Sequence, residues 1–575
     1  MKLQRFTLLI AALLITSAAV AQQAEPSAAK IQQHVTYLAS DELDGRRTGT
    51  AGANEAAKYI AKEFERLGIR PAPATDSRKI NVMSARYLQT FPYIGSVELG
   101  KNNVLSASGS DFRAGEDWMP LGISPNQKRN LTGVVFAGYG ITANELNYND
   151  YKATYNKNQV ALIQKGTPDG DNPHGRFTTA GQLRFKVAAA QSAGVGALLI
   201  ISNEDDFKNE ALAKLHYDNA GLAGIPVAVI SKQAAEKLMN AAKEVTLVTD
   251  VVRADVPAHN VVGVIEGSDP VLKNESIVIG AHYDHLGRGG EGSLAPRSGE
   301  IHHGADDNAS GTAGVLELAR IFSTQRAKLK RTLVFIAFGG EEEGLLGSNY
   351  YVNHPLWPLD KTVAMINMDM IGRMKDRKLV IGGVGTAKEW RGLITAGANN
   401  AFELTMNEDG YGPSDHSSFY SKQIPVLFFW TGTHNDYHKP SDTFEKINYA
   451  DEARILSLVA RIVTDVDSAD PRLTFTTAKS EPARGGTFRV YLGTIPNYAD
   501  SNDGLLIDGV RDDSPAAKAG LKAGDKIVKI SNREVKNVYD YTSALGEMKA
   551  GQEYVIEVMR GGEKLTLKIV PAARN

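Results

Sequence analysis

The second half of the chain alternates short apolar runs with amphipathic segments. Ile277–Ile279, Thr332–Phe338, Val363–Met368 and Pro425–Trp430 are typical of buried strands, because nearly all of their side chains are apolar. Thr312–Phe322, between the first two runs, has apolar residues at three- and four-residue spacing, which indicates a helix. Buried strands that alternate with helices predict an α/β domain with a mostly parallel or mixed sheet.

The residues before this region show two different hydrophobic patterns. Helical spacing between Ile31 and Leu67 surrounds a glycine-rich loop, Asp44–Gly52. Further on, short strands such as Val160–Ile163 and Ala197–Ile201 are separated by loops, and metal-binding residue types do not cluster there. We therefore expect a β-rich domain inserted into the α/β domain.

The N-terminal residues have the pattern of a secretory signal. Lys2 and Arg5 are basic, Leu8–Ile15 is apolar, and Ala19-Val-Ala21 is a small-x-small cleavage site. The apolar run is too short to span a hydrocarbon layer of ~30 Å, so an uncleaved anchor is the weaker alternative. We expect export to the periplasm or the cell exterior, and no integral membrane segment after signal cleavage.

Composition narrows the chemistry that the chain can perform. No cysteine occurs among the 575 residues, which excludes disulfides, thiolate nucleophiles and thiolate metal ligands. The formal net charge is -2, so no global charge excess favours binding to nucleic acid. Any bound metal must therefore be held by histidine, aspartate and glutamate.

Five segments of the α/β domain place carboxylates or imidazoles directly after a strand, where open α/β sheets carry their sites. Their candidate residues are His282 with Asp284, Asp306 with Asp307, Glu341 with Glu342, Asp369, and Tyr437 with His438.

Each segment also has a structural interpretation. His282 is suited to bind zinc through one ring nitrogen while Asp284 accepts the N–H of the other, although a single histidine is more often structural. Asp306 and Asp307 would either cap the helix that follows or offer one carboxylate to two metals. Asp369 stands in an apolar run, where its charge must be paired or coordinated.

The set as a whole points to a metal centre. Oxygen and nitrogen ligands without sulfur suit zinc, and also cobalt or manganese. Two imidazoles and three carboxylates, one of them shared, would give each of two ions three protein ligands and room for a common water molecule.

These segments closely resemble the co-catalytic di-zinc aminopeptidase family, which includes bacterial secreted leucyl-type aminopeptidases, glutamate carboxypeptidase II and, as an inactive relative, the transferrin receptor. The resemblance covers about residues 30–110 and 256–468 and implies a three-layer α/β fold with a mostly mixed sheet. The matching residues are His282-Tyr-Asp284, Asp306-Asp307-Asn308-Ala-Ser-Gly311, Glu341-Glu342, Asp369 and Tyr437-His438.

The resemblance implies two Zn2+ per chain and five protein ligands: His282, Asp307, Glu342, Asp369 and His438. In this assignment Asp307 bridges both ions, His282 and Asp369 complete one site, and Glu342 and His438 complete the other.

The same resemblance implies three catalytic roles. Glu341 is the general base that takes a proton from the attacking water and passes it to the leaving amine. Asp284 supports His282, and Tyr437 donates a hydrogen bond to the developing oxyanion.

Two further units carry resemblances of their own. The insert resembles a protease-associated domain through Gly138-Tyr-Gly140 and Ala188–Ile200, and the C-terminal unit resembles a PDZ domain through Tyr491-Leu-Gly493-Thr, its carboxylate-binding loop. Pro496, close to that loop, has no N–H to donate. The expected domains are a signal peptide (1–21), the first part of the peptidase domain (22–110), the insert (111–255), the di-zinc peptidase domain (256–470), a linker (471–484) and the PDZ-like domain (485–572).

The resemblance therefore implies an exported metallo-aminopeptidase acting on peptides with a free N-terminus, with a C-terminal peptide as a candidate ligand of the PDZ-like domain. A carboxypeptidase or amino-acyl deacylase of the same fold is the alternative enzyme, since Arg288, Arg297 and Arg373 lie near the motifs and could hold a carboxylate. A receptor-like scaffold is the non-enzymatic alternative, against which the intact ligand set argues.

Overall fold

A computed structural model describes the chain from residue 25 to residue 573. The predicted signal peptide and Arg297 lie outside the described residues. Within this span it leaves out residues 74–83, 144–145, 153–154, 171–175, 178–179, 218–220, 242–243, 291, 296–298, 479–489, 498–502 and 512. In the part that is described, no helix combines the length and the apolar character needed to cross a membrane.

A nine-stranded mixed sheet forms the centre of the α/β domain, in the order β1-β14-β16-β15-β17-β20-β18-β19, with β2 paired to β14. Its middle strands run parallel: β16 (Thr332–Phe338), β15 (Ser276–His282), β17 (Thr362–Met368) and β20 (Val426–Trp430). All residues of β15, β16 and β17 are buried, as the continuous apolar runs predict. The remaining strands are β1 (Arg70–Pro71), β2 (Leu88–Leu99), β14 (Val251–Ile265), β18 (Lys378–Gly382) and β19 (Glu403–Met406).

Helices cover both faces of this sheet, so the domain has the three layers that the resemblance implies. One face packs against α1 (Ala28–Leu38), α2 (Ala51–Arg66), α5 (Gly311–Ser323), α7 (Trp390–Ala398) and α9 (Tyr449–Ser468). The other face packs against α6 (Leu346–Asn353) and α8 (His416–Tyr420).

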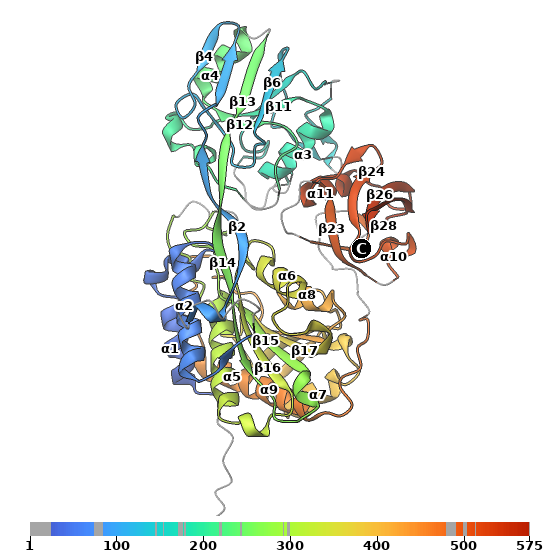
Figure 1. Cartoon of the computed structure of the whole chain (residues 1–575). Coiled ribbons are helices and arrows are strands. Elements are labelled where there is room, and N and C mark those ends of the chain that lie inside the picture. Colours follow the sequence, from blue (N-terminus) through green and yellow to red (C-terminus); the bar gives the residue numbers. More distant parts are fainter. Residues whose placement is uncertain are drawn as a thin grey trace, which may run out of the picture.

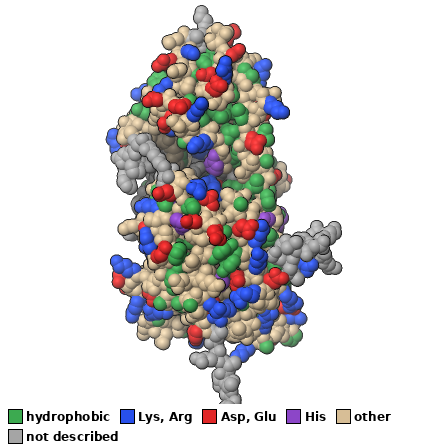
Figure 2. All heavy atoms as spheres, turned by 90° about the vertical axis from the view of Figure 1, so that its left-hand side faces the viewer, with side chains coloured by type: hydrophobic (Ala, Val, Ile, Leu, Met, Phe, Trp, Pro, Cys, Tyr) green, Lys and Arg blue, Asp and Glu red, His purple; other side chains and the backbone are tan. Residues whose placement is uncertain are grey.

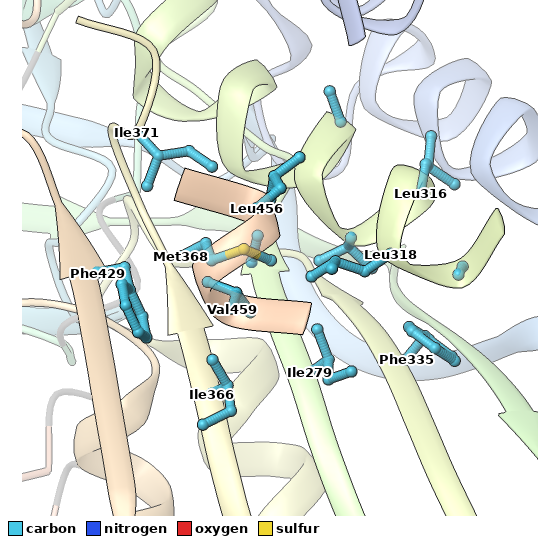
Figure 3. Close-up of a cluster of buried hydrophobic side chains, with 14 of the residues drawn as sticks. Ile279, Leu316, Leu318, Phe335, Ile366, Met368, Ile371, Phe429, Leu456 and Val459 are labelled. Atoms are coloured by element: carbon cyan, nitrogen blue, oxygen red, sulfur yellow. The ribbon is translucent and has the colours of Figure 1, made fainter. Parts of the chain in front are cut away.

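The first of these cores lies directly beneath the strand ends that carry the candidate site. Side chains from neighbouring strands interlock there with those of α5 and α9, which fixes the strands relative to one another (Figure 3). The labelled members are Ile279, Leu316, Leu318, Phe335, Ile366, Met368, Ile371, Phe429, Leu456 and Val459.

The insert is joined to the α/β domain by a long antiparallel ribbon. β2 and β14 stay paired from Leu88 with Val261 to Leu99 with Val251, and carry the chain out of the central sheet (Figure 1). The insert itself has a five-stranded sheet, β5-β12-β11-β10-β7, and a four-stranded sheet, β4-β3-β13-β6. Its elements are β3 (Val104–Ala107), β4 (Ser110–Phe112), β5 (Trp118–Pro120), β6 (Gln127–Leu131), β7 (Val134–Phe136), β8 (Thr142–Ala143), β9 (Tyr148–Asn149), β10 (Val160–Gln164), α3 (Leu183–Ala193), β11 (Ala197–Ile201), β12 (Val227–Ile230), α4 (Lys232–Ala241) and β13 (Val245–Thr249).

One strand of the insert lies before residue 111, the first residue of the insert expected from the sequence. β3 precedes that boundary, yet it pairs with β13 inside the insert. Its four residues are too few to give a strand signal in the sequence, and its partner lies more than 130 residues further on.

The C-terminal unit has a small sheet, β22-β23-β24-β26-β27, with its own buried core. It lies beside both other regions, with α11 against α3 of the insert and β23 against the α/β domain (Figure 1). On the face shown in Figure 2, acidic and basic side chains are interspersed. The elements of the unit are β21 (Val490–Tyr491), β22 (Thr494–Pro496), β23 (Leu505–Val510), α10 (Pro515–Lys518), β24 (Lys526–Ile530), β25 (Arg533–Glu534), α11 (Val538–Glu547), β26 (Tyr554–Arg560), β27 (Glu563–Ile569) and β28 (Ala572–Ala573).

Candidate metal centre

The carboxyl ends of four neighbouring parallel strands meet at one edge of the central sheet. His282 is the last residue of β15, and Asp369 comes directly after β17. Glu341 and Glu342 follow β16, and His438 lies in the loop after β20. Side chains that are far apart in sequence therefore converge, as expected for an open α/β sheet.

Asp307 stands at the centre of this group. It lies in the short helical turn Ala305–Ser310 that leads into α5, where its backbone N–H donates to Asp442 Oδ2 at 3.1 Å. One of its carboxylate oxygens lies 3.4 Å from His282 Nε2, and the other lies 3.1 Å from His438 Nε2. The two oxygens thus face different imidazoles, which is the arrangement that a shared metal ligand requires.

His282, Asp307 and Asp369 form the first of two groups able to hold a metal ion. The distance from His282 Nε2 to Asp369 Oδ1 is 3.4 Å. Both of these atoms are buried, and within the described residues neither has a hydrogen-bond partner. Burying polar atoms without partners is costly, so a cation between them would satisfy both.

Glu342 belongs to the second group, together with Asp307 and His285. Glu342 Oε1 lies 2.6 Å from His285 Nδ1, and Glu342 Oε2 lies 3.4 Å from His438 Nε2. Two imidazoles therefore adjoin this group, whereas the sequence motifs predicted only His438. The signal for His285 was its place three residues after His282.

These separations can be compared with those of a zinc site. Two ligand atoms that each lie ~2.1 Å from a tetrahedral ion are roughly 3.4 Å apart. The distances from His282 to Asp307 and to Asp369, and from His438 to Glu342, are all 3.4 Å. They exceed ordinary hydrogen-bond lengths and match the spacing of ligands around a common ion. The chemistry of the donor set therefore fits zinc, and so do these three distances, whereas His438 Nε2 and Asp307 Oδ2 are closer, at 3.1 Å.

Electrostatics favour cations throughout the centre. Burial lowers the pKa of His282, but the Glu341 and Asp369 carboxylates outweigh it and hold that pKa well above its ordinary value. Burial likewise lowers the pKa of His438, and contact with Asp307 and Glu342 outweighs it, raising that pKa to about 9. The carboxylates thus produce a negative potential that a bound divalent cation would neutralise.

Neighbouring polar groups hold the proposed ligands in place. Asp284 Oδ2 accepts the Thr48 hydroxyl at 2.8 Å, and Asp284 Oδ1 accepts the Glu341 N–H at 3.2 Å. His282 Nδ1 lies closer to the Asp284 carbonyl oxygen, at 3.2 Å, than to the carboxylate, at 3.7 Å. Ser414 donates to Asp369 Oδ2 at 2.8 Å. Such second contacts orient ligands and tune their basicity.

Arg46 ties the N-terminal glycine-rich loop to the site, a role that the sequence did not reveal. It is 1% exposed and has a φ of 50°. An added Cβ on the preceding Gly45, whose φ is 70°, would meet the Gly287 carbonyl oxygen at 2.4 Å, so only glycine fits there. The Arg46 guanidinium donates to four carbonyl oxygens, those of Leu38, Tyr283, His303 and Gly304.

Glu341 and Tyr437 lie beside the ligand groups. Glu341 Oε2 is 3.8 Å from His282 Nε2. Burial raises the pKa of Glu341 well above its ordinary value; His282 opposes this, while the Glu342 and Asp369 carboxylates add to it. Tyr437 stacks on His438 with ring centroids 3.8 Å apart, and burial together with Asp307 raises the pKa of its phenol, which stays a donor.

A cavity of about 740 Å³ opens next to Glu341 and Glu342. Its volume is that of a typical small-ligand site. The fold and this cluster define the protein as an α/β enzyme with a cavity beside a candidate centre for two metal ions.

Comparison with known proteins identifies the domains. Residues 260–463 match the model of peptidase family M28, residues 131–238 match the PA domain, and residues 490–570 match the PDZ domain. The chain therefore contains a region similar to peptidase family M28, a PA domain insert and a C-terminal PDZ domain, which confirms the three resemblances seen in the sequence.

Several known proteins are similar to this chain. Aminopeptidase YwaD of Bacillus subtilis is 27% identical over 464 residues, covering 77% of this chain and 87% of its own. A probable leucine aminopeptidase of Arthroderma benhamiae is 32% identical over 196 residues, covering 32% of this chain and 53% of its own. The solved structure of BSAP, a zinc aminopeptidase from Bacillus subtilis, is 24% identical, covers 76% of this chain and 94% of its own, and has a TM-score of 0.49.

Proposed function

We propose that the protein is an exported aminopeptidase that binds two zinc ions per chain and hydrolyses the first peptide bond of its substrates. The observation that carries the proposal is the placement of Asp307. Its two oxygens face His282 and His438 at 3.4 and 3.1 Å, and each imidazole also faces a second carboxylate at 3.4 Å. Relatives that align over most or part of the chain are aminopeptidases by name.

The roles of the metal ligands follow the first group, and they follow the second with His438 in place of His285. His282 and Asp369 would hold one ion, Glu342 and His438 the other, and Asp307 both. When bound, the two zinc ions would polarise the scissile carbonyl and lower the pKa of a water molecule toward neutrality. His285, hydrogen-bonded to Glu342, would orient that carboxylate and not ligate directly.

Three further residues would carry the proton and charge movements. Glu341, with its raised pKa, accepts a proton from the attacking water and delivers it to the leaving amine. Tyr437 keeps its proton and donates a hydrogen bond to the carbonyl oxygen as negative charge develops there. Asp284 holds the Glu341 backbone in place, through the N–H that it accepts.

The charges of the cavity wall favour entry of the substrate peptide by its N-terminus. A free substrate amine is a cation, and Glu341 and Glu342 both line the cavity. Of the three arginines that would serve a carboxypeptidase, the two that the structure describes are already engaged. Arg288 pairs with Asp44 at 2.8 Å and is mostly exposed, and Arg373 pairs with Asp436 at 3.0 Å.

Zinc content and direction of attack test the proposal together. Elemental analysis of the purified chain should give two zinc ions, and strong chelators should remove both the metal and the activity. Digestion of a peptide library with free N-termini, read by mass spectrometry, should show stepwise loss of N-terminal residues. Activity that persists without metal, or loss of C-terminal residues instead, would overturn it. Export is tested by fractionating producing cells and sequencing the N-terminus, which should begin at Gln22.

A further inference from the structure

The groove of the PDZ domain opens into the cavity beside the metal centre. The α/β domain contributes Glu341 and Glu342 to the cavity wall. The PDZ domain contributes its carboxylate-binding loop and both sides of its groove: Leu492, Gly493, Thr494, Tyr541, Thr542 and Leu545. One continuous space of about 740 Å³ thus connects the proposed general base with a site for a peptide carboxylate.

Polar contacts fix the PDZ domain in this orientation. Asn349 of α6 donates to Asp508 of β23 at 3.0 Å, and Arg511 forms an ion pair with Asp409. β23 also approaches the α/β domain closely, because a Cβ added to Gly509 would meet the Tyr411 hydroxyl oxygen at 1.7 Å. The groove is therefore held over the cavity by a specific, closely fitted interface.

The carboxylate-binding loop has donors ready for an anion. The carbonyl oxygens of Leu492 and Gly493 accept hydrogen bonds from Ala516 and Arg511, each at 2.8 Å. The N–H groups of Leu492 and Gly493 have no acceptor among the described residues. Gly493 has a φ of 83°, and a Cβ there would meet Ser514 at 2.2 Å, so the close turn depends on glycine.

The open edge of β22 limits how far a peptide can pair. The Arg511 N–H donates to the Gly493 carbonyl oxygen, which makes Thr494 and Val510 a non-hydrogen-bonded pair. The N–H and C=O of Thr494 therefore face away from β23, toward the groove. Pro496 faces the same way but has no N–H, so strand addition starts at Thr494 and stops at Pro496.

We propose that the PDZ domain binds the C-terminal carboxylate of the same peptide whose N-terminus lies at the metal centre. It would then act as a distal subsite that selects short peptides with a free C-terminus. Carboxylates at one end of the cavity and the N–H donors of Leu492 and Gly493 at the other complement the two charged ends of such a peptide. This inference rests on the proposed aminopeptidase function.

Three substrate types separate the subsite from the catalytic step. Leucine p-nitroanilide reports the metal centre alone, because it has no peptide C-terminus. Peptides of leucine followed by one to eight alanines, as free acids, report length selection. The same peptides as C-terminal amides report the carboxylate contact. We expect kcat/KM to peak at one short length, and amidation to lower it there by at least about tenfold, since charge-assisted hydrogen bonds are lost.

Two groove variants and one control locate the effect. Leu545→Glu, or Thr542→Glu if the first fails to fold, places a negative charge beside the bound carboxylate. Either should bring the acid-to-amide ratio close to one, and the ratio is compared within each variant, so that a change in the overall rate does not enter it. Val555→Glu, at an exposed position of β26 in the same domain, should keep the wild-type ratio.

The outcomes distinguish this inference from the proposed function. Equal cleavage of acids and amides with a flat length profile, alongside release of N-terminal leucine, would overturn the subsite and leave the aminopeptidase standing. A ratio unchanged in a folded groove variant would do the same. Release of C-terminal alanine, or no hydrolysis of leucine p-nitroanilide, would overturn the proposed function itself.

Discussion

The two halves of the candidate metal centre are supported in different ways. His282 is the last residue of a central strand, is 1% exposed, and faces Asp369, whose other oxygen accepts the Ser414 hydroxyl. His438 lies in a loop with a φ of 54°, and its side chain is 13% exposed. A ligand on a packed strand is held more precisely than one on a loop. We infer that the His282 half holds its ion more tightly than the His438 half.

Asp307 is the residue that the two halves share, so changing it should have the largest effect. Asp307→Ala removes a ligand from both proposed sites, and we expect loss of both zinc ions and a fall in kcat/KM of more than ~10²-fold. Zinc content and rate are measured on the same sample. Asp360→Ala, which changes an exposed carboxylate, is the control. A variant that keeps its zinc would show that Asp307 is not the bridge.

Glu341 and Glu342 are neighbours in sequence with different proposed roles: Glu341 is the general base, and Glu342 is a metal ligand. Glu341→Gln keeps the shape and removes the proton acceptor, so kcat should fall by at least ~10²-fold with zinc content unchanged. Glu342→Gln should instead reduce the zinc content of the His438 half. The opposite pattern, with metal loss only in Glu341→Gln, would reverse the two assignments.

Single imidazole variants test the difference in affinity directly. His438→Ala should leave one zinc ion per chain, retained by the better supported His282 half. His285→Ala should leave two, with weaker binding of the second by roughly 10–100-fold, as is usual when an outer partner of a ligand is lost. Titration with a competing chelator measures both constants. Loss of an ion in His285→Ala but not in His438→Ala would make His285 the ligand.

The substrate amine is expected to meet the cavity side of the centre, where Glu341 and Glu342 line the wall. Acetylating the N-terminus removes the ammonium and leaves carboxylates without their donor, so kcat/KM should fall by at least ~10-fold. The same peptide with and without the acetyl group gives the ratio. Equal rates would show that no carboxylate receives the amine.

The smallest expected effect comes from removing a hydrogen bond to Asp284, which lies next to His282. Thr48→Val removes the hydroxyl that donates to Asp284 at 2.8 Å and leaves a buried oxygen without that donor. We expect the free energy of unfolding to fall by about 1–3 kcal/mol, with zinc content retained. Thermal unfolding of the zinc-loaded protein measures it. A change in zinc stoichiometry would mean that Thr48 controls the ligand itself.

The sequence predicted the elements beneath the site more fully than the contacts around it. β16 begins and ends at the residues expected from its apolar run, because a fully buried strand must be apolar throughout. Asp369 was recognisable because a lone charge in an apolar run needs a partner. Arg46 was not, since its role depends on loops brought together by the fold, and the position of His285 three residues after His282 did not show which carboxylate it would meet.

The position of the PDZ groove could not be predicted from the sequence either. It depends on contacts such as Asn349 with Asp508 and Arg511 with Asp409, which join residues more than 100 positions apart. Each is an ordinary polar pair with no local pattern. The carboxylate-binding loop was visible as a motif, but nothing in it indicates which surface it faces.

Arg46 links two distant parts of the chain beside the metal centre. Its guanidinium donates to the carbonyl oxygens of His303 and Gly304 and to that of Leu38, across more than 250 positions of chain. The turn that carries Asp307 is therefore held by the first helix, α1, as well as by the strands. Local opening of α1 would remove these hydrogen bonds and loosen the metal centre without any change in the central sheet.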